Sequence, residues 1–304
     1  MLVVRQRLRT SAMISIVAAS LLLCLSGCQA PLPRGYDETI RIGSFNIQAF
    51  GGTKAGRPGT MAVLAEIVER FDVLAIQEVG SGNSSASEAT CIASMETLLS
   101  GVNAIAGEEA YSYVRFDQYA IIYKNSSLEL LLYGPYSGGQ SFVYPPLSAY
   151  FKSRLGNLDY SIMSVHTSPS KATLEIAALP LAMADVALAH GDPDVICAGD
   201  FNADGFYYDE GSGTDLAAFP SGSFITVIPN TADTTVASSS NTYDRMQITQ
   251  SMSSDYSWRW DVYEFGRYHD VTRLEGTESM DGTESSVSDH YPVRAEFYIR
   301  RDTD

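Results

Sequence analysis

The sequence predicts one α/β domain in which helices cover the faces of β-sheets. Its 304 residues are 45% apolar and 18% charged, a composition that supports a large hydrophobic core. Segments with strand-like and helix-like hydrophobic spacing alternate along the chain, and no proline-rich linker or internal repeat separates them. We therefore expect a single folded domain over residues 39–304.

The charge balance argues against a broad basic surface. Lys and Arg number 20 against 36 Asp and Glu, which gives a formal net charge of −16. Proteins that bind nucleic acid through a general electrostatic footprint carry the opposite sign. A phosphate-containing partner would therefore have to be held by a local site.

The first 27 residues have the pattern of a secretory leader. Three arginines within the first nine residues precede an uncharged stretch that extends to Arg34. Within it, Leu25-Ser26-Gly27-Cys28 resembles the lipobox of bacterial lipoproteins, where the leader is cut before a cysteine that carries a diacylglycerol. The alternative, an uncleaved transmembrane anchor, is less favoured because serines and a glycine interrupt a span of barely sufficient length.

The predicted mature protein therefore begins at Cys28 and is tethered through residues 28–38. Removing the leader takes away three arginines and no acid, so the mature chain carries −19. We expect a lipid-anchored extracytoplasmic protein of the cell envelope, at the outer membrane, its periplasmic face or the cell surface.

Eight segments read as strands because they are short, apolar and rich in β-branched or aromatic residues. They are Ile40–Ile47, Val73–Ile76, Tyr119–Tyr123, Leu128–Leu132, Tyr160–Val165, Val195–Ala198, Met246–Thr249 and Tyr291–Ile299.

Three segments read as helices: Thr60–Arg70, Ala86–Leu99 and Lys171–His190. In the last of these, a group of apolar residues falls roughly on one face, which we expect to pack on a sheet. That group is Leu174, Ala177, Ala178, Leu181 and Val186. Cys91 lies in a predicted helix and Cys197 in a predicted strand, so both are expected to be buried, unpaired thiols.

Polar residues that bind cations or move protons follow most of the predicted strands. Asn46, Glu78, His166 and Asp200 each come at or just after the end of an apolar run, and Asn202 follows Asp200. Taken singly, each of these is a solvated loop residue or a turn cap. Because they recur strand after strand, we expect one sheet edge to collect them.

Acidic residues and a histidine also precede two strands. Asp244 stands before one of them, and Asp289-His290 before the last. The alternative interpretation of Asp244 is a surface ion pair with Arg245. Carboxylates and carboxamides suit a hard divalent cation, and the His or Cys spacing of zinc sites is absent.

The chain resembles the endonuclease/exonuclease/phosphatase superfamily, and within it the pancreatic-type deoxyribonucleases. The resemblance implies a four-layer α/β/β/α sandwich with two central, mostly antiparallel sheets. It rests on segments that occur in the family's order: Ser44–Ile47, Ile76–Val79, His166–Ser170, Gly199–Asp204, Ala232–Thr235, Thr242–Arg245 and Ser288–Val293.

The resemblance also implies residue roles in a metal site. Glu78 ligates Mg²⁺, with Mn²⁺ as an alternative ion, and Asn46 and Asp289 lie in or near the metal's shell. Asp200 and Asn202 orient the attacking water and a phosphate oxygen, or hold a second metal.

The same resemblance supplies two acid/base imidazoles. His290 is steered by Asp244, and His166 by Asp117. A carboxylate behind an imidazole fixes its tautomer and stabilises its protonated form. Which imidazole is the base and which the acid is left open.

Two departures from the family pattern concern side-chain length and covalent links. Asp117 stands where the family has a longer Glu, so its pairing with His166 is expected to be longer or water-bridged. Gly205 and Asn241 stand where the family has a long-range disulfide, so packing must supply the few kcal/mol that such a link contributes.

The family's structural calcium sites are only partly retained. Asp233, Thr235 and Ser239 match the first, with Ala237 in place of one side-chain ligand. The loop over residues 134–142 has no acid for the second.

We expect a Mg²⁺-dependent phosphodiester hydrolase, a monomeric DNA endonuclease without sequence specificity that leaves 5′-phosphate ends. The alternative within the superfamily is a phospholipid or sphingomyelin phosphodiesterase that uses the anchor and an aromatic loop as membrane contacts. That loop carries Tyr133, Tyr136, Phe142 and Tyr144. A catalytically silent binding lipoprotein is the third hypothesis, which gives no reason to retain both imidazoles.

Arginines with which the family reaches DNA are missing here. Gln48, Gly80 and Tyr144 occupy the matching positions, and Arg115 is the nearby replacement. Phosphate contacts supply most non-specific DNA affinity. The sequence therefore predicts weak binding of duplex DNA and tolerance of single strands.

Overall fold

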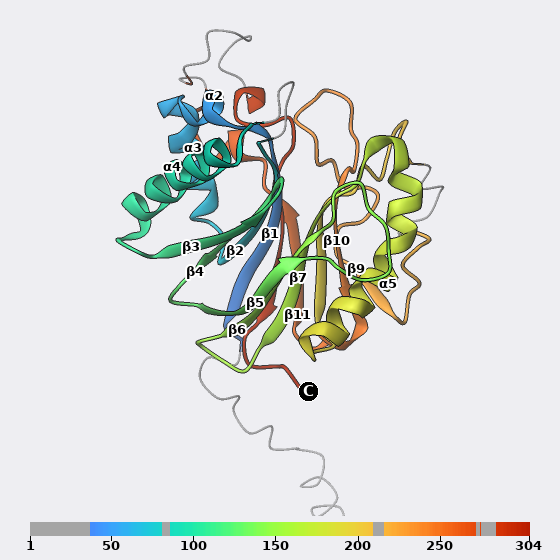
Figure 1. The fold of residues 1–304 in the computed structure, drawn as a ribbon. Coiled ribbons are helices and arrows are strands. Elements are labelled where there is room, and N and C mark those ends of the chain that lie inside the picture. Colours follow the sequence, from blue (N-terminus) through green and yellow to red (C-terminus); the bar gives the residue numbers. More distant parts are fainter. Residues whose placement is uncertain (1–36, 81–85, 209–215, 272–273, 275–283) are drawn as a thin grey trace, which may run out of the picture. The chain divides into compact units, whose positions relative to one another are not determined.

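Two six-stranded sheets lie face to face, and helices cover their outer surfaces (Figure 1). The computed structural model describes residues 37–80, 86–208, 216–271, 274 and 284–304. The predicted leader and Cys28 lie outside the described residues.

The first sheet has the order β11-β12-β1-β2-β4-β3 and the second β5-β6-β7-β8-β10-β9. The pairs β1·β2 and β7·β8 are parallel, and the other pairs are antiparallel. The strands of the first sheet are β1 (Thr39–Phe50), β2 (Val73–Val79), β3 (Tyr111–Phe116), β4 (Tyr119–Lys124), β11 (Tyr256–Val262) and β12 (Val293–Tyr298). Those of the second are β5 (Leu128–Pro135), β6 (Leu147–Ser153), β7 (Asp159–His166), β8 (Val195–Asp200), β9 (Phe224–Thr226) and β10 (Asp244–Thr249).

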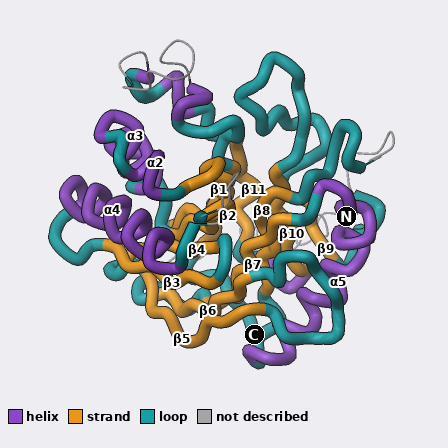
Figure 2. The backbone as a smooth tube through the Cα atoms, turned by 45° about the horizontal axis from the view of Figure 1, so that its top comes forward, coloured by secondary structure: helices purple, strands orange, loops and turns teal. Residues whose placement is uncertain are grey.

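Helices α2 (Gly52–Ala55), α3 (Pro58–Val68) and α4 (Glu88–Ala106) lie on one side, and α5 (Ala172–His190) on the other (Figure 2). Local sequence sets their ends. Pro58 begins α3, and the Ser87 hydroxyl caps α4 by accepting from Thr90 N. Gly191, at φ 77°, ends α5 in the left-handed conformation.

Three apolar clusters fill the spaces between these layers. The central cluster joins the two sheets and includes Ile42, Phe151 and Ile196. The second packs α3 and α4 on the first sheet, and the third packs α5 on the second sheet. The predicted four-layer α/β/β/α sandwich with mostly antiparallel sheets is therefore confirmed.

All eight predicted strands and all three predicted helices are present, but the predicted packing face of α5 was wrong. Of the predicted group only Val186 is buried, and Leu174 and Leu181 are 73% and 58% exposed. Ile176, Leu179 and Met183 are buried instead. The helix is apolar on both sides, so hydrophobic spacing alone could not identify the side that meets the sheet. The strands that the sequence analysis missed are β3, β6, β9 and β11.

Two helical segments, α4 and Pro169–His190, are long and apolar enough to cross a membrane by length and composition. Each packs one face on a sheet, as the helices that cover a core do.

The cysteine prediction is confirmed, because Cys91 and Cys197 are buried and unpaired. At the position of the missing family disulfide, a Cβ on Gly205 would lie 3.2 Å from Asn241 Oδ1. The two loops therefore meet there without a covalent link. The Asp204 carboxylate joins them instead, by accepting from Thr242 N at 2.7 Å.

Candidate active site

Residues from the ends of four strands meet at one edge of the sandwich. Asn46 comes from β1 and Glu78 from β2, whereas His166 and Asp200 end β7 and β8 of the other sheet. Asn46 Nδ2 donates to Glu78 Oε1 at 2.9 Å and to Asp200 Oδ2 at 3.0 Å. One amide thus holds carboxylates from both sheets toward a common point.

A buried polar contact below this edge fixes the two sheets against each other. Gln77 Nε2 donates to Ser44 Oγ at 3.0 Å within the first sheet and to Ser164 Oγ at 2.9 Å in the second. All three side chains are fully buried. Because a buried polar group is costly unless it is paired, this contact favours one alignment of the sheets.

Gly199 allows β7 and β8 to approach closely next to the site. A Cβ at this position would collide with the backbone carbonyl of Val165. The parallel register places His166 opposite Asp200. Position 199 therefore needs a glycine, because the strands that carry His166 and Asp200 lie too close together there for a side chain.

The two imidazoles flank a single carboxylate oxygen. His166 Nε2 lies 3.6 Å from Asp200 Oδ2, and His290 Nε2 lies 3.7 Å from the same atom. All three residues are nearly inaccessible to solvent. A phosphate group placed at this edge would meet two imidazole nitrogens at once.

His290 has the partner that the sequence analysis predicted. Its Nδ1 lies 2.8 Å from Asp244 Oδ2, and Asp244 is fully buried. The alternative, a surface ion pair between Asp244 and Arg245, is excluded. Arg245 is itself fully buried and donates to the backbone oxygens of Thr242 and Ala203.

The predicted pairing of His166 with Asp117 was wrong. His166 Nδ1 contacts the side-chain Oε1 of Gln118 at 3.1 Å. Asp117 occupies the turn between β3 and β4 at φ 51°, and its backbone oxygen accepts from Arg115. The next residue in the turn is therefore the one that reaches the imidazole, and His166 is oriented by a neutral amide.

Burial and neighbouring charges have opposite effects on the pKa of His290. Burial alone would lower its pKa, but the carboxylates of Asp244, Asp200 and Asp289 outweigh that effect and raise the pKa to about 10. Burial likewise acts to raise the pKa of Asp200, yet His290 and His166 together hold it below the usual value. The site therefore favours an imidazolium at His290 beside an ionised Asp200.

Three site residues have a left-handed backbone, which is unusual for residues other than glycine. The φ angles are 66° at Glu78, 47° at Asn202 and 47° at Gln48. Such conformations cost about 1–3 kcal/mol each and persist where surrounding contacts impose them. Each of the three residues takes part in a local hydrogen bond: Ala49 N donates to Glu78 Oε2, Gln48 N to Asn46 Oδ1 and Asn202 N to Asp200 Oδ1.

The donor set fits a hard divalent cation. Glu78 and Asp200 converge on the same Asn46 nitrogen, and Asp289 Oδ1 lies 3.8 Å from His290 Nε2. Oxygen ligands of this kind suit Mg²⁺. Asn46 itself turns its nitrogen toward the carboxylates, because its Oδ1 accepts from Gln48 N at 3.0 Å. In this arrangement its amide nitrogen positions the predicted ligands, and its place in the metal's shell stays a prediction.

Asn202 lies beside Asp200 at the site, and its side-chain amide nitrogen already donates a hydrogen bond. Its Nδ2 donates to Thr167 O at 2.9 Å, and its backbone N–H donates to Asp200 Oδ1 at 2.9 Å. Asn202 therefore links the end of β8 to the segment that follows His166.

Lys54 was missed by the sequence analysis. Its Nζ donates to the backbone oxygens of Ile47, Gln48 and Val287 at 2.8, 2.6 and 2.9 Å. Burial lowers its pKa to about 8, opposed by the charges of Asp289 and Glu78. The lysine joins the end of β1 to the segment before Asp289. No local pattern in the short, glycine-flanked helix α2 indicated this role.

The residues of the predicted calcium site also come together. Thr235 Oγ1 donates to Asp233 Oδ1 at 3.0 Å and to Ser239 O at 2.8 Å. Thr235 forms a bridge with His290, so this loop supports the segment that carries the imidazole. Calcium binding here stays a prediction.

An aromatic rim borders the imidazoles. Tyr144 stacks on His166 with ring centres 6.1 Å apart, and Tyr243 lies 6.2 Å from His290. Arg115, the expected replacement for the missing DNA-binding arginines, is engaged elsewhere. Its guanidinium pairs with Glu88 and donates to Asp117 O, and its side chain is only 8% exposed.

Comparison with known proteins gives consistent results. A profile of the Endonuclease/Exonuclease/phosphatase family matches residues 43–290. Deoxyribonuclease-1 of Oryctolagus cuniculus is 26% identical over 262 residues, which cover 84% of this chain and 91% of that protein. Deoxyribonuclease-1 of Bos taurus is 27% identical over 273 residues, with coverage of 84% and 91%. A family protein of Bacteroides thetaiotaomicron shares the fold, with a TM-score of 0.61, 17% identity and coverage of 85% of this chain and 97% of that one.

Proposed function

The chain belongs to the endonuclease/exonuclease/phosphatase family, and from this premise we propose that it is a Mg²⁺-dependent endonuclease that hydrolyses DNA to 5′-phosphate ends. The observation that carries the proposal is the placement of two imidazole nitrogens, 3.6 and 3.7 Å from one oxygen of Asp200. The curated relatives whose names state a deoxyribonuclease support the choice of DNA.

The chemistry follows from the contacts at this edge. Glu78 would hold Mg²⁺ with Asp289 and Asp200 nearby, and the ion would offset the negative charge that develops on the phosphate oxygens. Asp200, held by Asn46 Nδ2 and Asn202 N, orients the attacking water. His290 acts in its protonated form and donates to the phosphate or to the leaving oxygen, because three carboxylates raise its pKa.

His166 completes the pair from the other side. Gln118 holds its Nδ1, which leaves Nε2 directed at Asp200 and the substrate space. A neutral partner orients the ring without adding negative charge behind it. The two imidazoles are therefore not equivalent, and His166 suits the role of proton acceptor.

One comparison of substrates tests the proposed activity. The full chain with Mg²⁺ is incubated in parallel with supercoiled plasmid and with sphingomyelin vesicles, and nicking and choline-phosphate release are measured. Nicking with 5′-phosphate ends supports the endonuclease. Turnover of the vesicles alone would favour the phospholipid phosphodiesterase, and no turnover of either would favour a silent binding protein.

The aromatic rim favours unpaired substrates. Tyr144 is 39% exposed and stacks on His166, and Arg115 is not free to reach a phosphate. Stacking on an aromatic ring contributes about 1–3 kcal/mol per base and does not need a duplex. We therefore expect kcat/KM to be higher on single-stranded than on duplex oligonucleotides.

Tyr144→Arg tests this preference. The variant is expected to gain affinity for duplex DNA and to steepen the logarithmic salt dependence of kcat/KM by about one unit, because it adds one phosphate contact. Tyr133→Arg, on an exposed strand position away from the imidazoles, is the matched control. Tight duplex binding by the wild type, with a salt slope that Tyr144→Arg leaves unchanged, would contradict the idea.

Anchoring is a separate proposal that rests on the leader and on Leu25–Cys28, outside the described residues. Two or more acyl chains on Cys28 would give stable membrane attachment, which a single chain does not. We expect a fatty-acid analogue to label the wild type and not Cys28→Ser. Equal labelling of both proteins would show that Cys28 is not the site.

A further inference from the structure

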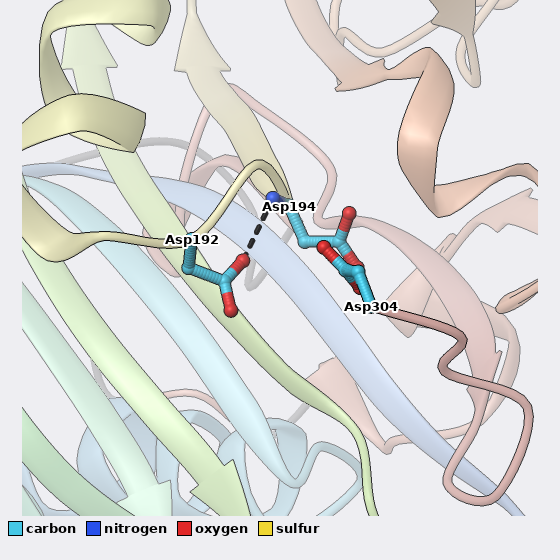
Figure 3. A group of neighbouring side chains, drawn as sticks. All are labelled: Asp192, Asp194 and Asp304. Atoms are coloured by element: carbon cyan, nitrogen blue, oxygen red, sulfur yellow. Dashed lines mark hydrogen bonds between the residues drawn. The ribbon is translucent and has the colours of Figure 1, made fainter.

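A group of carboxylates lies at the opposite end of β8 from the active site. Asp192 and Asp194 precede the strand, and Asp304 approaches them from the end of the chain shown (Figure 3). One oxygen from each of the three lies within 4.8 Å of the others. Asp200 ends the same strand, and six residues of strand span about 20 Å. The group is therefore separate from the catalytic carboxylates.

Two of the acids at this end are buried and carry carboxylate oxygens without a hydrogen-bond partner among the described residues. Asp194 is 1% exposed, and neither of its carboxylate oxygens has a partner. The neighbouring Ser251 hydroxyl is directed at Pro193 O and Thr249 Oγ1, at 3.1 and 3.0 Å. Asp255 is also 1% exposed, and its Oδ1 is unpaired. Buried carboxylates in this state are costly unless a proton neutralises them or a cation meets them.

The surrounding charge is predominantly negative. Burial raises the pKa of Asp194 to about 8; the nearby Ser251 hydroxyl acts to lower it, and the like charges of Asp304, Asp255 and Asp192 add to the rise. Asp302 adds a further acid, which accepts from Asp304 N and Asp159 N at 3.2 Å each.

Two cations oppose this charge at its margins. Lys152 lies 3.6 Å from Asp159, and Arg301 opposes the charge of Asp255 while it pairs with Asp37 at 2.5 Å. Among the described residues, neither of them donates a hydrogen bond to the oxygens of Asp194.

We propose that Asp192, Asp194 and Asp304 form a structural Ca²⁺ site that ties the β8 end of the second sheet to the final residues of the chain. Oxygens that share one Ca²⁺ at about 2.3–2.6 Å lie at most about 5 Å apart, which the observed spacing satisfies. Ca²⁺ accepts six to eight oxygens in irregular geometry, whereas Mg²⁺ requires a near-ideal octahedron. Water would supply the remaining ligands, and the charge of Asp255 adds to the negative potential at Asp194.

This site differs from the calcium site that the family resemblance predicts. That one involves Asp233, Thr235 and Ser239, beside His290. The two can therefore be removed independently by substitution.

Calcium titration of the full chain in detergent, after removal of bound metal, tests the proposal. We expect the wild type to gain about 5 °C in Tm at saturating Ca²⁺, because a ligand that binds only the folded state stabilises it. Asp194→Asn should lose that gain and bind one Ca²⁺ fewer by calorimetry. Its Tm without calcium should be no lower than that of the wild type, because an amide of the same shape replaces a carboxyl group whose ionised form burial disfavours.

Asp304→Asn, at an exposed position that does not endanger folding, should weaken Ca²⁺ affinity about tenfold. Asp233→Asn is the matched control and should keep the Ca²⁺ binding that depends on Asp194. Undiminished binding and Tm gain in both Asp194→Asn and Asp304→Asn would overturn the site. An equal gain with Mg²⁺ would overturn its assignment to calcium.

Discussion

Asp200→Ala is expected to lower kcat by about 10³-fold or more while leaving the fold intact. A single oxygen of Asp200 contacts Asn46 Nδ2 at 3.0 Å and both imidazoles at 3.6 and 3.7 Å. Its removal separates both proton carriers from the carboxylate that aligns them. When catalytic residues act as a unit, removing any one of them lowers kcat by orders of magnitude.

The loss should not be additive with that of the other members. Glu78→Ala, His166→Ala and His290→Ala are each expected to abolish nearly all hydrolysis, and Asp200→Ala combined with any of them should cost little more. Glu129→Gln, an exposed acid of β5, is the control that should keep wild-type turnover. The measurements are single-turnover rates in Mg²⁺ and circular dichroism. Wild-type turnover in any of the four variants would show that its assigned role is wrong.

Asp244→Asn is expected to lower kcat by about 10²–10⁴-fold and to move the alkaline limb of its pH profile to lower pH. Asp244 is the strongest of the carboxylates that raise the pKa of His290 to about 10. If the imidazolium is the active form, activity is present below that pKa and falls as pH rises through it. An amide at position 244 removes the negative charge, so the pKa of His290 drops. Activity should therefore begin to fall at a lower pH. The magnitude follows the loss seen when a carboxylate that orients a catalytic histidine becomes an amide.

The profile is measured at saturating Mg²⁺ for both proteins, so that metal occupancy does not differ. Asp233→Asn changes an acid in the supporting loop that does not contact His290, and it should leave the alkaline limb in place. An alkaline limb at the same pH in the wild type and Asp244→Asn would refute a protonated role for His290.

Much of the site was predictable because its residues follow a local pattern. Apolar runs that end in Asn46, Glu78, His166 and Asp200 define both a strand and its polar end, and parallel neighbours bring such ends to one edge. The pairing of Asp244 with His290 also came from motif order. The predicted strands and helices were found for the same reason, since hydrophobic period is a property of adjacent residues.

The remaining contacts depend on how distant segments meet. Gln118 replaced Asp117 as the partner of His166, because the left-handed turn residue sends its neighbour inward. Lys54 found its three carbonyl partners in two segments far apart in the chain. Neither choice changes the local hydrophobic pattern, so neither was visible in it.

The sequence by itself determined the fold class, the strand ends that carry the chemistry and the unpaired state of Cys91 and Cys197. Tertiary structure decided which face of α5 is buried, how the Asn46 amide turns and where Asp194 meets Asp304. Residue type and period are encoded locally, whereas a side chain's partner depends on which distant backbone or charge packing places beside it. A shift of one residue along a turn or a helix points a different side chain at a given partner, although the order of apolar residues in the sequence is unchanged.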